Sequence, residues 1–214
     1  SKHTKMPVLK VEEGLKVQAN HVYVIAPNTS LTMDGCTFCL SSLSKTDGKS
    51  IDRFFKSVAA DQRESVIGIV FSGTGTDGTL GLKAIKEHGG LTMAQVPDTA
   101  KFDSMPRSAV ASGFVDLILT VEEMPARILE YTKHVDAVQQ RKGKEAIQRE
   151  VVEYLPQILP VLRKQTGHDF SRYKQSTLIR RIQRRMQVHY LDSAARYAEC
   201  LDQSPEEVEA LFKD

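Results

Sequence analysis

The chain has 214 residues, of which 41% are hydrophobic and 26% are charged, a composition typical of a soluble globular protein with one full domain and a smaller one. The longest apolar stretch, around Ile67 to Phe71, is far too short to span a bilayer, and the first ten residues lack the apolar core of a signal peptide. From these features we expect a soluble, unexported and cytoplasmic protein.

The net charge of +2 hides a strong segregation of charge along the chain. Residues 141–190 contain twelve Lys or Arg against four Asp or Glu, whereas residues 191–214 contain two against seven. The basic block is therefore the candidate surface for an acidic partner.

The three cysteines, an odd number in a long chain, argue against a disulfide framework and indicate a reducing compartment. Residues 21–26 predict a strand, and Asp34-Gly35 predicts the turn of a β-hairpin that contains Cys36 and Cys39. Positions three apart on a strand face opposite sides, so the two thiols would diverge. Since no second Cys/His pair has zinc-finger spacing, we predict no metal site.

The next hundred residues alternate between helix-like and strand-like patterns. Apolar residues at i, i+3, i+4 and i+7 predict a helix over residues 50–61; they are Ile51, Phe54, Phe55 and Val58. The unbroken apolar run at 66–71 is typical of a parallel strand covered on both faces. A helix over 79–88 should end at Gly89-Gly90, and strands follow at 91–96 and 115–120 with a short segment, 106–112, between them. This order implies a doubly wound, mainly parallel sheet.

From about Val135 the sequence becomes helical throughout. Thr120 and Glu123 have the spacing of a capping box for the helix that leads into this region, and residues 136–150 are interpreted as a linker or an exposed helix. A helix with an apolar face ends at Thr166-Gly167, and the last helix begins at Ser204-Pro205, with Glu207 completing a capping box. The chain then stops within a predicted helix, which suggests truncation.

The helix over 177–189 carries the densest positive charge. Its pattern predicts apolar side chains on one side and four arginines on the other: Arg180, Arg181, Arg184 and Arg185.

The loop FSGTGTDG, residues 71–78, satisfies G-x-G-x-x-G between a strand and a helix, with glycines at 73, 75 and 78. A dinucleotide-binding turn would place a pyrophosphate at that helix start, but Asp77 would put a carboxylate in the same place. Two like charges about 4 Å apart cost about 1 kcal/mol in water and several times more where solvent is excluded. A carboxylate at the end of a strand can instead orient a histidine, as in a Ser-His-Asp triad. A dinucleotide-binding domain stays open as the less favoured alternative.

The segment from His3 to Pro125 resembles the C-terminal two-thirds of the catalytic domain of CheB, the chemotaxis protein-glutamate methylesterase. The resemblance rests on the G-T-G-T-D-G turn, the "GMP"-like Ser104-Met105-Pro106-Arg107 and the VDLIL strand, which recur in family order. It implies a serine hydrolase that cleaves γ-glutamyl methyl esters on receptor helices and also deamidates glutamine there. By resemblance, Asp77 is the triad acid and Thr74 offers a backbone amide to the oxyanion.

The sequence departs from the family at two catalytic positions. The family's nucleophilic Ser lies in a GASAGG-type turn and its His at the end of an "HL" strand, and neither motif occurs here. Ser72, Ser104, His3 and His21 are not convincing substitutes. We therefore expect no esterase turnover from this chain alone.

Residues 151–214 resemble the N-terminal helical subdomain of CheR, the chemotaxis receptor methyltransferase, through DFSRYK, the RRIQRRM helix and a Tyr-containing helix. The resemblance implies that the four arginines face acidic receptor helices, and that S-adenosylmethionine belongs to a catalytic domain absent from this chain. Duplex nucleic acid is a weaker alternative partner, because the basic helix lacks interleaved aromatic residues and acidic helices follow it.

Together these features predict an α/β domain over 1–135 that lacks its N-terminal strands, a linker over 136–150 and a helical subdomain over 151–214. The expected fold is a partial doubly wound, mainly parallel sheet with a β-hairpin, followed by a small all-α subdomain. The missing strands should expose one sheet edge, which favours self-association or a partner chain. In function, the sequence predicts either an enzyme fragment of receptor adaptation or a non-catalytic receptor-docking scaffold.

Overall fold

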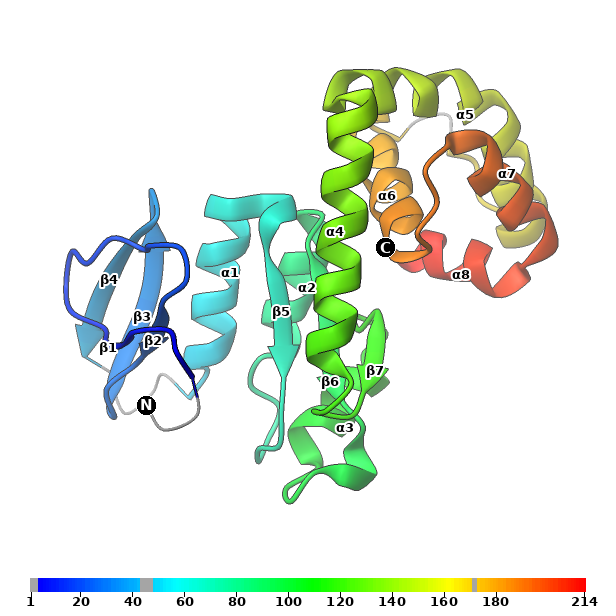
Figure 1. Ribbon diagram of the computed structural model, residues 1–214. Helices are drawn as coiled ribbons and strands as arrows, with labels where there is room; N and C mark the ends of the chain where they lie inside the picture. Colours follow the sequence, from blue (N-terminus) through cyan, green and yellow to red (C-terminus); the bar gives the residue numbers. More distant parts are fainter. Residues whose placement is uncertain (1–3, 43–47, 171–172) are drawn as a thin grey trace. The chain divides into compact units, whose positions relative to one another are not determined.

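The computed structural model describes residues 4–42, 48–170 and 173–214. The chain divides after Ile118 into two compact units, here called the N-terminal unit and the C-terminal unit. The N-terminal unit mixes strands and helices and the C-terminal unit is helical (Figure 1). The predicted fold class, an α/β part followed by an all-α part, is confirmed.

The N-terminal unit begins with two small sheets. Strands β1 (Val8–Lys10) and β2 (Val22–Val24) pair in parallel, and β3 (Thr29–Asp34) and β4 (Thr37–Ser42) form the predicted antiparallel hairpin. Asp34 pairs with Thr37, so the turn residues are Gly35 and Cys36, with φ of +54° and +59°. These positive angles match a turn whose twist suits a hairpin. The prediction placed the turn one residue too early.

Helix α1 (Ser50–Gln62) confirms the predicted helix and packs against both β3 and helix α2 (Thr79–Glu87) (Figure 1). Phe54 contributes to the small core formed by Val11, Leu31 and Phe38 under the hairpin. Phe55 instead packs toward α2 and the larger sheet. One helix thus joins the hairpin to the rest of the unit.

The larger sheet has three strands in the order β5 (Ile67–Val70), β6 (Leu91–Gln95) and β7 (Leu117–Leu119), and β5 and β6 are parallel as predicted. Short 3₁₀ turns η1 (Arg63–Ser65) and η2 (Pro97–Thr99) and helix α3 (Ser104–Ala111) complete the unit. All five residues of β6 are buried, whereas β5 lies at an edge with Phe71 exposed just beyond it. The expectation that this sheet has a bared edge stays a prediction, since the four residues of β5 are buried or half-buried.

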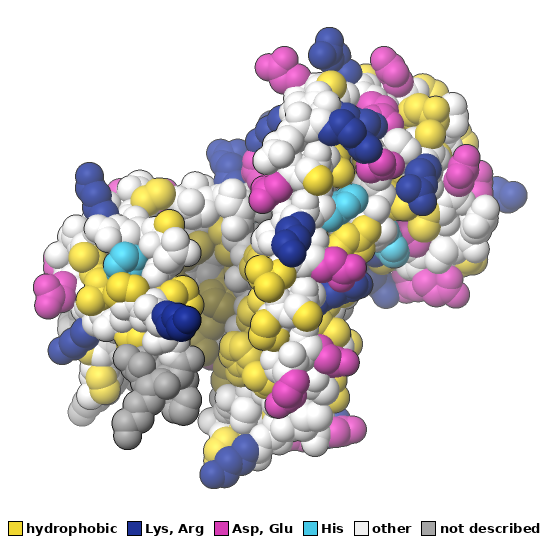
Figure 2. Space-filling view, viewed as in Figure 1, with side chains coloured by type: hydrophobic (Ala, Val, Ile, Leu, Met, Phe, Trp, Pro, Cys, Tyr) yellow, Lys and Arg dark blue, Asp and Glu magenta, His cyan; other side chains and the backbone are white. Residues whose placement is uncertain are grey.

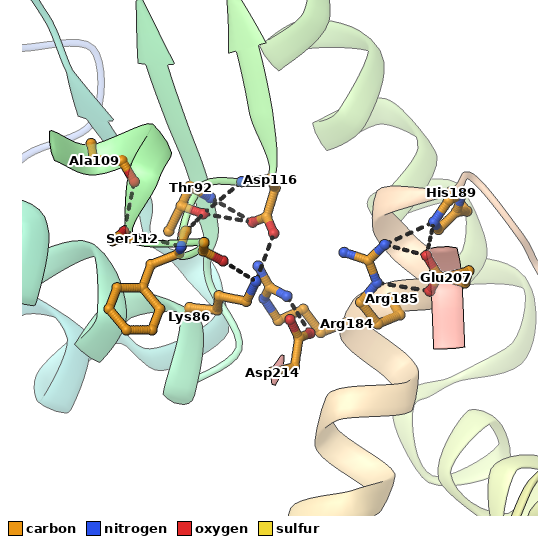
Figure 3. Close-up of polar contacts among 12 residues, drawn as sticks. Lys86, Thr92, Ala109, Ser112, Asp116, Arg184, Arg185, His189, Glu207 and Asp214 are labelled. Atoms are coloured by element: carbon orange, nitrogen blue, oxygen red, sulfur yellow. Dashed lines mark hydrogen bonds and ion pairs between the residues drawn. The ribbon is translucent and has the colours of Figure 1, made fainter. Parts of the chain in front are cut away.

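A buried ion pair lies beside this sheet, between α2 and the residue before β7 (Figure 3). Lys86 Nζ of α2 lies 3.7 Å from Asp116 Oδ1, and Asp116 Oδ2 accepts hydrogen bonds from the amide and hydroxyl of Thr92 on β6. The Asp116 side chain has no exposed surface. Such a pair fixes the position of the strand end that follows it, because either partner left alone would be a buried charge.

The C-terminal unit consists of five helices along the described residues after Leu119: α4 (Met124–Lys142), α5 (Lys144–Thr166), α6 (Gln175–Val188), α7 (Ala194–Gln203) and α8 (Pro205–Lys213). One apolar core joins α5, α6, α7 and α8, with Tyr197, Ile158, Leu162 and Ile182 fully buried at its centre. None of the helices in the described ranges has the length and apolarity needed to cross a membrane. The predicted end of α5 at Gly167, in the left-handed conformation, is confirmed.

The segment 136–150, predicted as a linker or exposed helix, is helical on both sides of Gly143. It also contacts other helices of its unit. Lys142 donates to Glu150 and to the carbonyl of Asp192, and Glu150 accepts from the amide of Ala194 at the start of α7. These bonds make the segment part of the C-terminal unit.

Candidate functional site

The loop after β5, residues 71–78, is held by hydrogen bonds to the segment before α3. Gly73 donates to the carbonyl of Phe102, and Gly75 donates to the hydroxyl of Ser104, at 2.9 and 3.0 Å. The hydroxyl of Ser72 accepts from the amide of Phe102 at 2.9 Å. The hydroxyls of Ser72 and Ser104 thus fasten this loop.

Asp77 lies near the end of this loop, which follows the carboxyl end of β5. Its carboxylate binds the start of α1: Oδ2 accepts from the amide of Ile51 at 3.0 Å, and Oδ1 accepts from the amides of Asp52 and Gly78, both at 2.9 Å. Lys49, the residue before α1, makes no side-chain cap of its own. Asp77 therefore supplies the missing cap of α1.

Thr74 lies at the exposed tip of the same loop. The amides of its neighbours Gly73 and Gly75 have acceptors, whereas the amide of Thr74 has none among the residues that the structure describes. An amide free to donate is what an oxyanion-binding position requires. The catalytic roles of Thr74 and Asp77 stay predictions.

The start of α2, which a dinucleotide would need, is already occupied by a carboxylate. The amide of Gly81 in its first turn donates to Oδ1 of Asp52 at 2.7 Å, and Asp52 is 2% exposed. A phosphate placed there would meet Asp52 as well as Asp77, so the geometry argues against the dinucleotide alternative.

Of the two histidines near the start of the sequence, one lies within the described residues. His3 lies outside the described residues, and the ring of His21 contacts the carbonyl of Ala19 and stacks near Tyr23. Cys36 and Cys39 are free thiols, and within the described ranges no group of three or more His, Cys, Asp or Glu is placed to hold a metal ion.

The four arginines of α6 do not form one exposed face, which corrects the prediction for that helix. Arg180 is exposed and Arg181 half-buried, but Arg184 and Arg185 are only 2% and 7% exposed. Arg184 pairs with Asp214 at 2.5 Å and Arg185 pairs with Glu207, both acids lying at α8 (Figure 3). On the face of the C-terminal unit seen in Figure 2, acidic and basic side chains are interspersed.

Arg185 and Glu207 form the centre of a buried polar cluster. Oε1 of Glu207 accepts from Arg185 Nε at 2.8 Å and from the Tyr197 hydroxyl at 2.7 Å, and Oε2 lies 2.5 Å from His189 Nε2. Burial raises the pKa of Glu207, but the hydrogen bonds from Arg185 and His189 outweigh it and lower the pKa to about 2. The capping box predicted for α8 is therefore only half formed: Ser204 accepts from the amide of Glu207, while the Glu207 side chain turns to α6.

Sequence reasoning missed Asp52 and the partners of Arg184 and Arg185. Asp52 was detectable as an acidic residue in the first turn of a predicted helix, a position that favours carboxylates. Arg185 follows Leu178 by seven residues and Ile182 by three, which is the spacing of the apolar face itself.

Comparison with known proteins identifies both units. The model of the CheB methylesterase family matches residues 1–128 of this chain. The chain belongs to this family. Residues 154–214 match the all-alpha domain of the CheR methyltransferase family. The chain therefore combines a methylesterase-type domain with a methyltransferase-type helical domain, both of which belong to chemotaxis adaptation systems.

Individual relatives include proteins named as methylesterases. A 104.1 kDa uncharacterised protein of Rhodobacter capsulatus is 34% identical over all of this chain, which spans 25% of that relative's length. A Leptospira interrogans protein named as a putative protein-glutamate methylesterase/protein-glutamine glutaminase is 33% identical over 55% of this chain and 62% of its own length. The catalytic domain of the Thermotoga maritima CheB methylesterase matches with a TM-score of 0.50 and 26% identity, over 56% of this chain and 67% of that chain.

Proposed function

We propose that this chain is part of a protein that adjusts the methylation of chemoreceptor glutamates, with the methylesterase-type unit contributing to ester hydrolysis. The observation that supports this most directly is Asp77, a carboxylate held at the carboxyl end of β5 by the amides of α1. In a hydrolytic triad such a group accepts the imidazole N–H and stabilises the imidazolium that forms when the serine is activated. Chemoreceptor helices are the proposed partner.

Ester hydrolysis also needs a nucleophile and a general base, which the family places in motifs that this sequence does not contain. We propose that the 214-residue chain alone has no turnover, and that Asp77 acts together with a serine and a histidine from elsewhere in a longer protein. S-adenosylmethionine is proposed for the catalytic domain of the methyltransferase alone, and no step in this chain depends on it.

The test compares the 214-residue chain with a longer protein in which a methylesterase segment carrying the family's serine and histidine motifs precedes it, using para-nitrophenyl acetate and a methylated receptor as substrates. The chain alone should show no hydrolysis above buffer, whereas in the longer protein Asp77→Ala should lower kcat by about 10⁴-fold. Asp61→Ala is the matched control, because Asp61 is an α1-borne carboxylate that binds the amides of Gly35 and Cys36 at the hairpin instead. Turnover by the chain alone, lost on Asp77→Ala, would contradict the proposal.

A second candidate function, docking to receptor helices without catalysis, is favoured by the exposed part of α6. Arg180 and Arg181 are the arginines of the predicted quartet that stay accessible, since Arg184 and Arg185 are committed to buried pairs. The double substitution Arg180→Glu/Arg181→Glu should weaken binding of an acidic receptor helix, while Arg163→Glu on α5 serves as an exposed control. Binding of duplex DNA with a steep salt dependence would favour nucleic acid as the partner instead.

A further inference from the structure

Two carboxylates cap the N-terminal ends of helices α1 and α2 reciprocally. Asp77, which precedes α2, accepts from the amides of Ile51 and Asp52 in the first turn of α1. Asp52, in that same turn of α1, accepts from the amide of Gly81 in the first turn of α2 at 2.7 Å. The start of α1 therefore binds a carboxylate from the loop before α2, and the start of α2 binds a carboxylate from α1.

Glycines allow the two helix starts to lie close enough for these hydrogen bonds. A Cβ at Gly81 would lie 2.5 Å from Cβ of Phe55, and one at Gly78 would lie 3.1 Å from Cγ2 of Ile51. Gly78 also has φ of +93°, which a side chain would strain. The close packing leaves Asp52 with a 3% exposed side chain, so its position is set by α2 as firmly as by its own helix.

The hydrogen bonds of Asp77 leave one direction open. Oδ1 accepts from two amides, Asp52 and Gly78, whereas Oδ2 accepts from Ile51 alone among the described residues. A carboxylate oxygen has two lone-pair positions, so Oδ2 can accept one more donor, such as an imidazole N–H. The direction of that remaining lone pair depends on where the first turn of α1 lies.

We propose that Asp52 is a positioning residue for Asp77. By fastening the first turn of α1 to α2, Asp52 holds in place the two amides that orient the Asp77 carboxylate. This inference rests on the proposed role of Asp77 in hydrolysis. Oδ2 of Asp52 has no hydrogen bond among the described residues, and Lys49 Nζ lies 4.0 Å from it. The bond from Oδ1 to Gly81 is therefore the contact that carries the effect.

The experiment follows the amide of Ile51 in the 214-residue chain by ¹H–¹⁵N NMR and hydrogen exchange. Asp52→Leu fills the same space without an acceptor, and Asp52→Asn keeps an oxygen for the amide of Gly81. We expect Asp52→Leu to speed exchange at Ile51 by about tenfold or more, and to move its resonance toward its position in Asp77→Ala. Asp52→Asn should restore both to near the wild-type values.

Asp61→Ala is the control for general loosening of α1, because it should release the amides of Gly35 and Cys36 and leave Ile51 unchanged. An Ile51 amide that keeps its protection and shift in a folded Asp52→Leu protein would overturn the proposal. If Asp52→Leu does not fold, a displaced Ile51 resonance in Asp52→Asn would overturn it, and a wild-type one would support it. These readouts need no turnover, so they fail or succeed separately from the hydrolysis assay.

Discussion

Replacing Glu207 by Gln should destabilise the C-terminal unit by removing the charge that Arg185 is buried against. Glu207 is 3% exposed, and its pKa in the folded chain is about 2, against an ordinary value of 4.5. Each pKa unit corresponds to about 1.4 kcal/mol, so the ionised form contributes about 3 kcal/mol to the free energy of unfolding. This agrees with the cost of about 3 to 5 kcal/mol for leaving one partner of a buried pair alone.

The same lowered pKa fixes the pH range of the effect. Because folding favours the ionised carboxylate, its contribution is complete above about pH 4.5 and is lost as the pH falls toward 2. The wild-type chain should therefore lose stability across this range, whereas Glu207→Gln should be less stable at pH 7 and change less on acidification. Arg185, His189 and Tyr197 all contact this carboxylate, so the comparison with the variant isolates its share.

Urea unfolding followed by tyrosine fluorescence is the suitable assay, since the chain has no Trp and every tyrosine except Tyr23 lies in the C-terminal unit. Glu209→Gln is the matched control on α8, because Glu209 is exposed and, among the described residues, pairs with Lys213 one turn away. An exposed pair of this kind contributes little to stability, because solvent screens it. Equal stability of Glu207→Gln and the wild type at pH 7, or equal slopes between pH 4.5 and 2, would refute the reasoning.

Two further substitutions probe the N-terminal unit. Gly90→Ala should cost about 2 kcal/mol or more in unfolding free energy, because its Cβ would lie 2.6 Å from the carbonyl oxygen of Val66. The control is Gly48→Ala, where an added Cβ meets open space among the described residues and should leave stability nearly unchanged. Circular dichroism melts measure both. Lys86→Met should destabilise the sheet by about 3 kcal/mol because Asp116 stays buried without its ammonium partner, while Lys83→Met, whose pair with Glu87 is exposed, should change stability by less than about 0.5 kcal/mol.

The elements with a clear period could be predicted because their pattern is local. Helix α1 half-buries the apolar residues that its spacing indicates, α5 buries an apolar face, and Gly167 ends α5 as its position suggests. The sequence predicted which segments are strands better than it predicted the place of each strand in the sheet. The most apolar run became the edge strand β5, and the fully buried strand is β6, whose Thr92 and Gln95 bond to side chains and backbone from later segments.

The arginine face of α6 shows where local pattern fails. A helical repeat separates two sides of α6, but it contains no information about α8, which supplies Glu207 and Asp214 to the flank of the helix. Half of the predicted surface charge was therefore neutralised inside the unit by acids more than twenty residues away. The segregation of positive charge before residue 190 and negative charge after it is, in part, internal pairing.

The loop at 71–78 shows why charge discriminates better than glycine spacing. Each glycine has a structural reason in this chain, either close packing or a positive φ. Gly73 lies against Met105, Gly75 has φ of +87°, and Gly78 has φ of +93° and lies beside Ile51. The same spacing would suit a phosphate, because tight turns before helices share these demands. The carboxylate of Asp77 is what separates the two chemistries, since it binds the start of a different helix and leaves an acceptor oxygen at the strand end. A turn built this way is suited to receive a proton donor and unsuited to receive an anion.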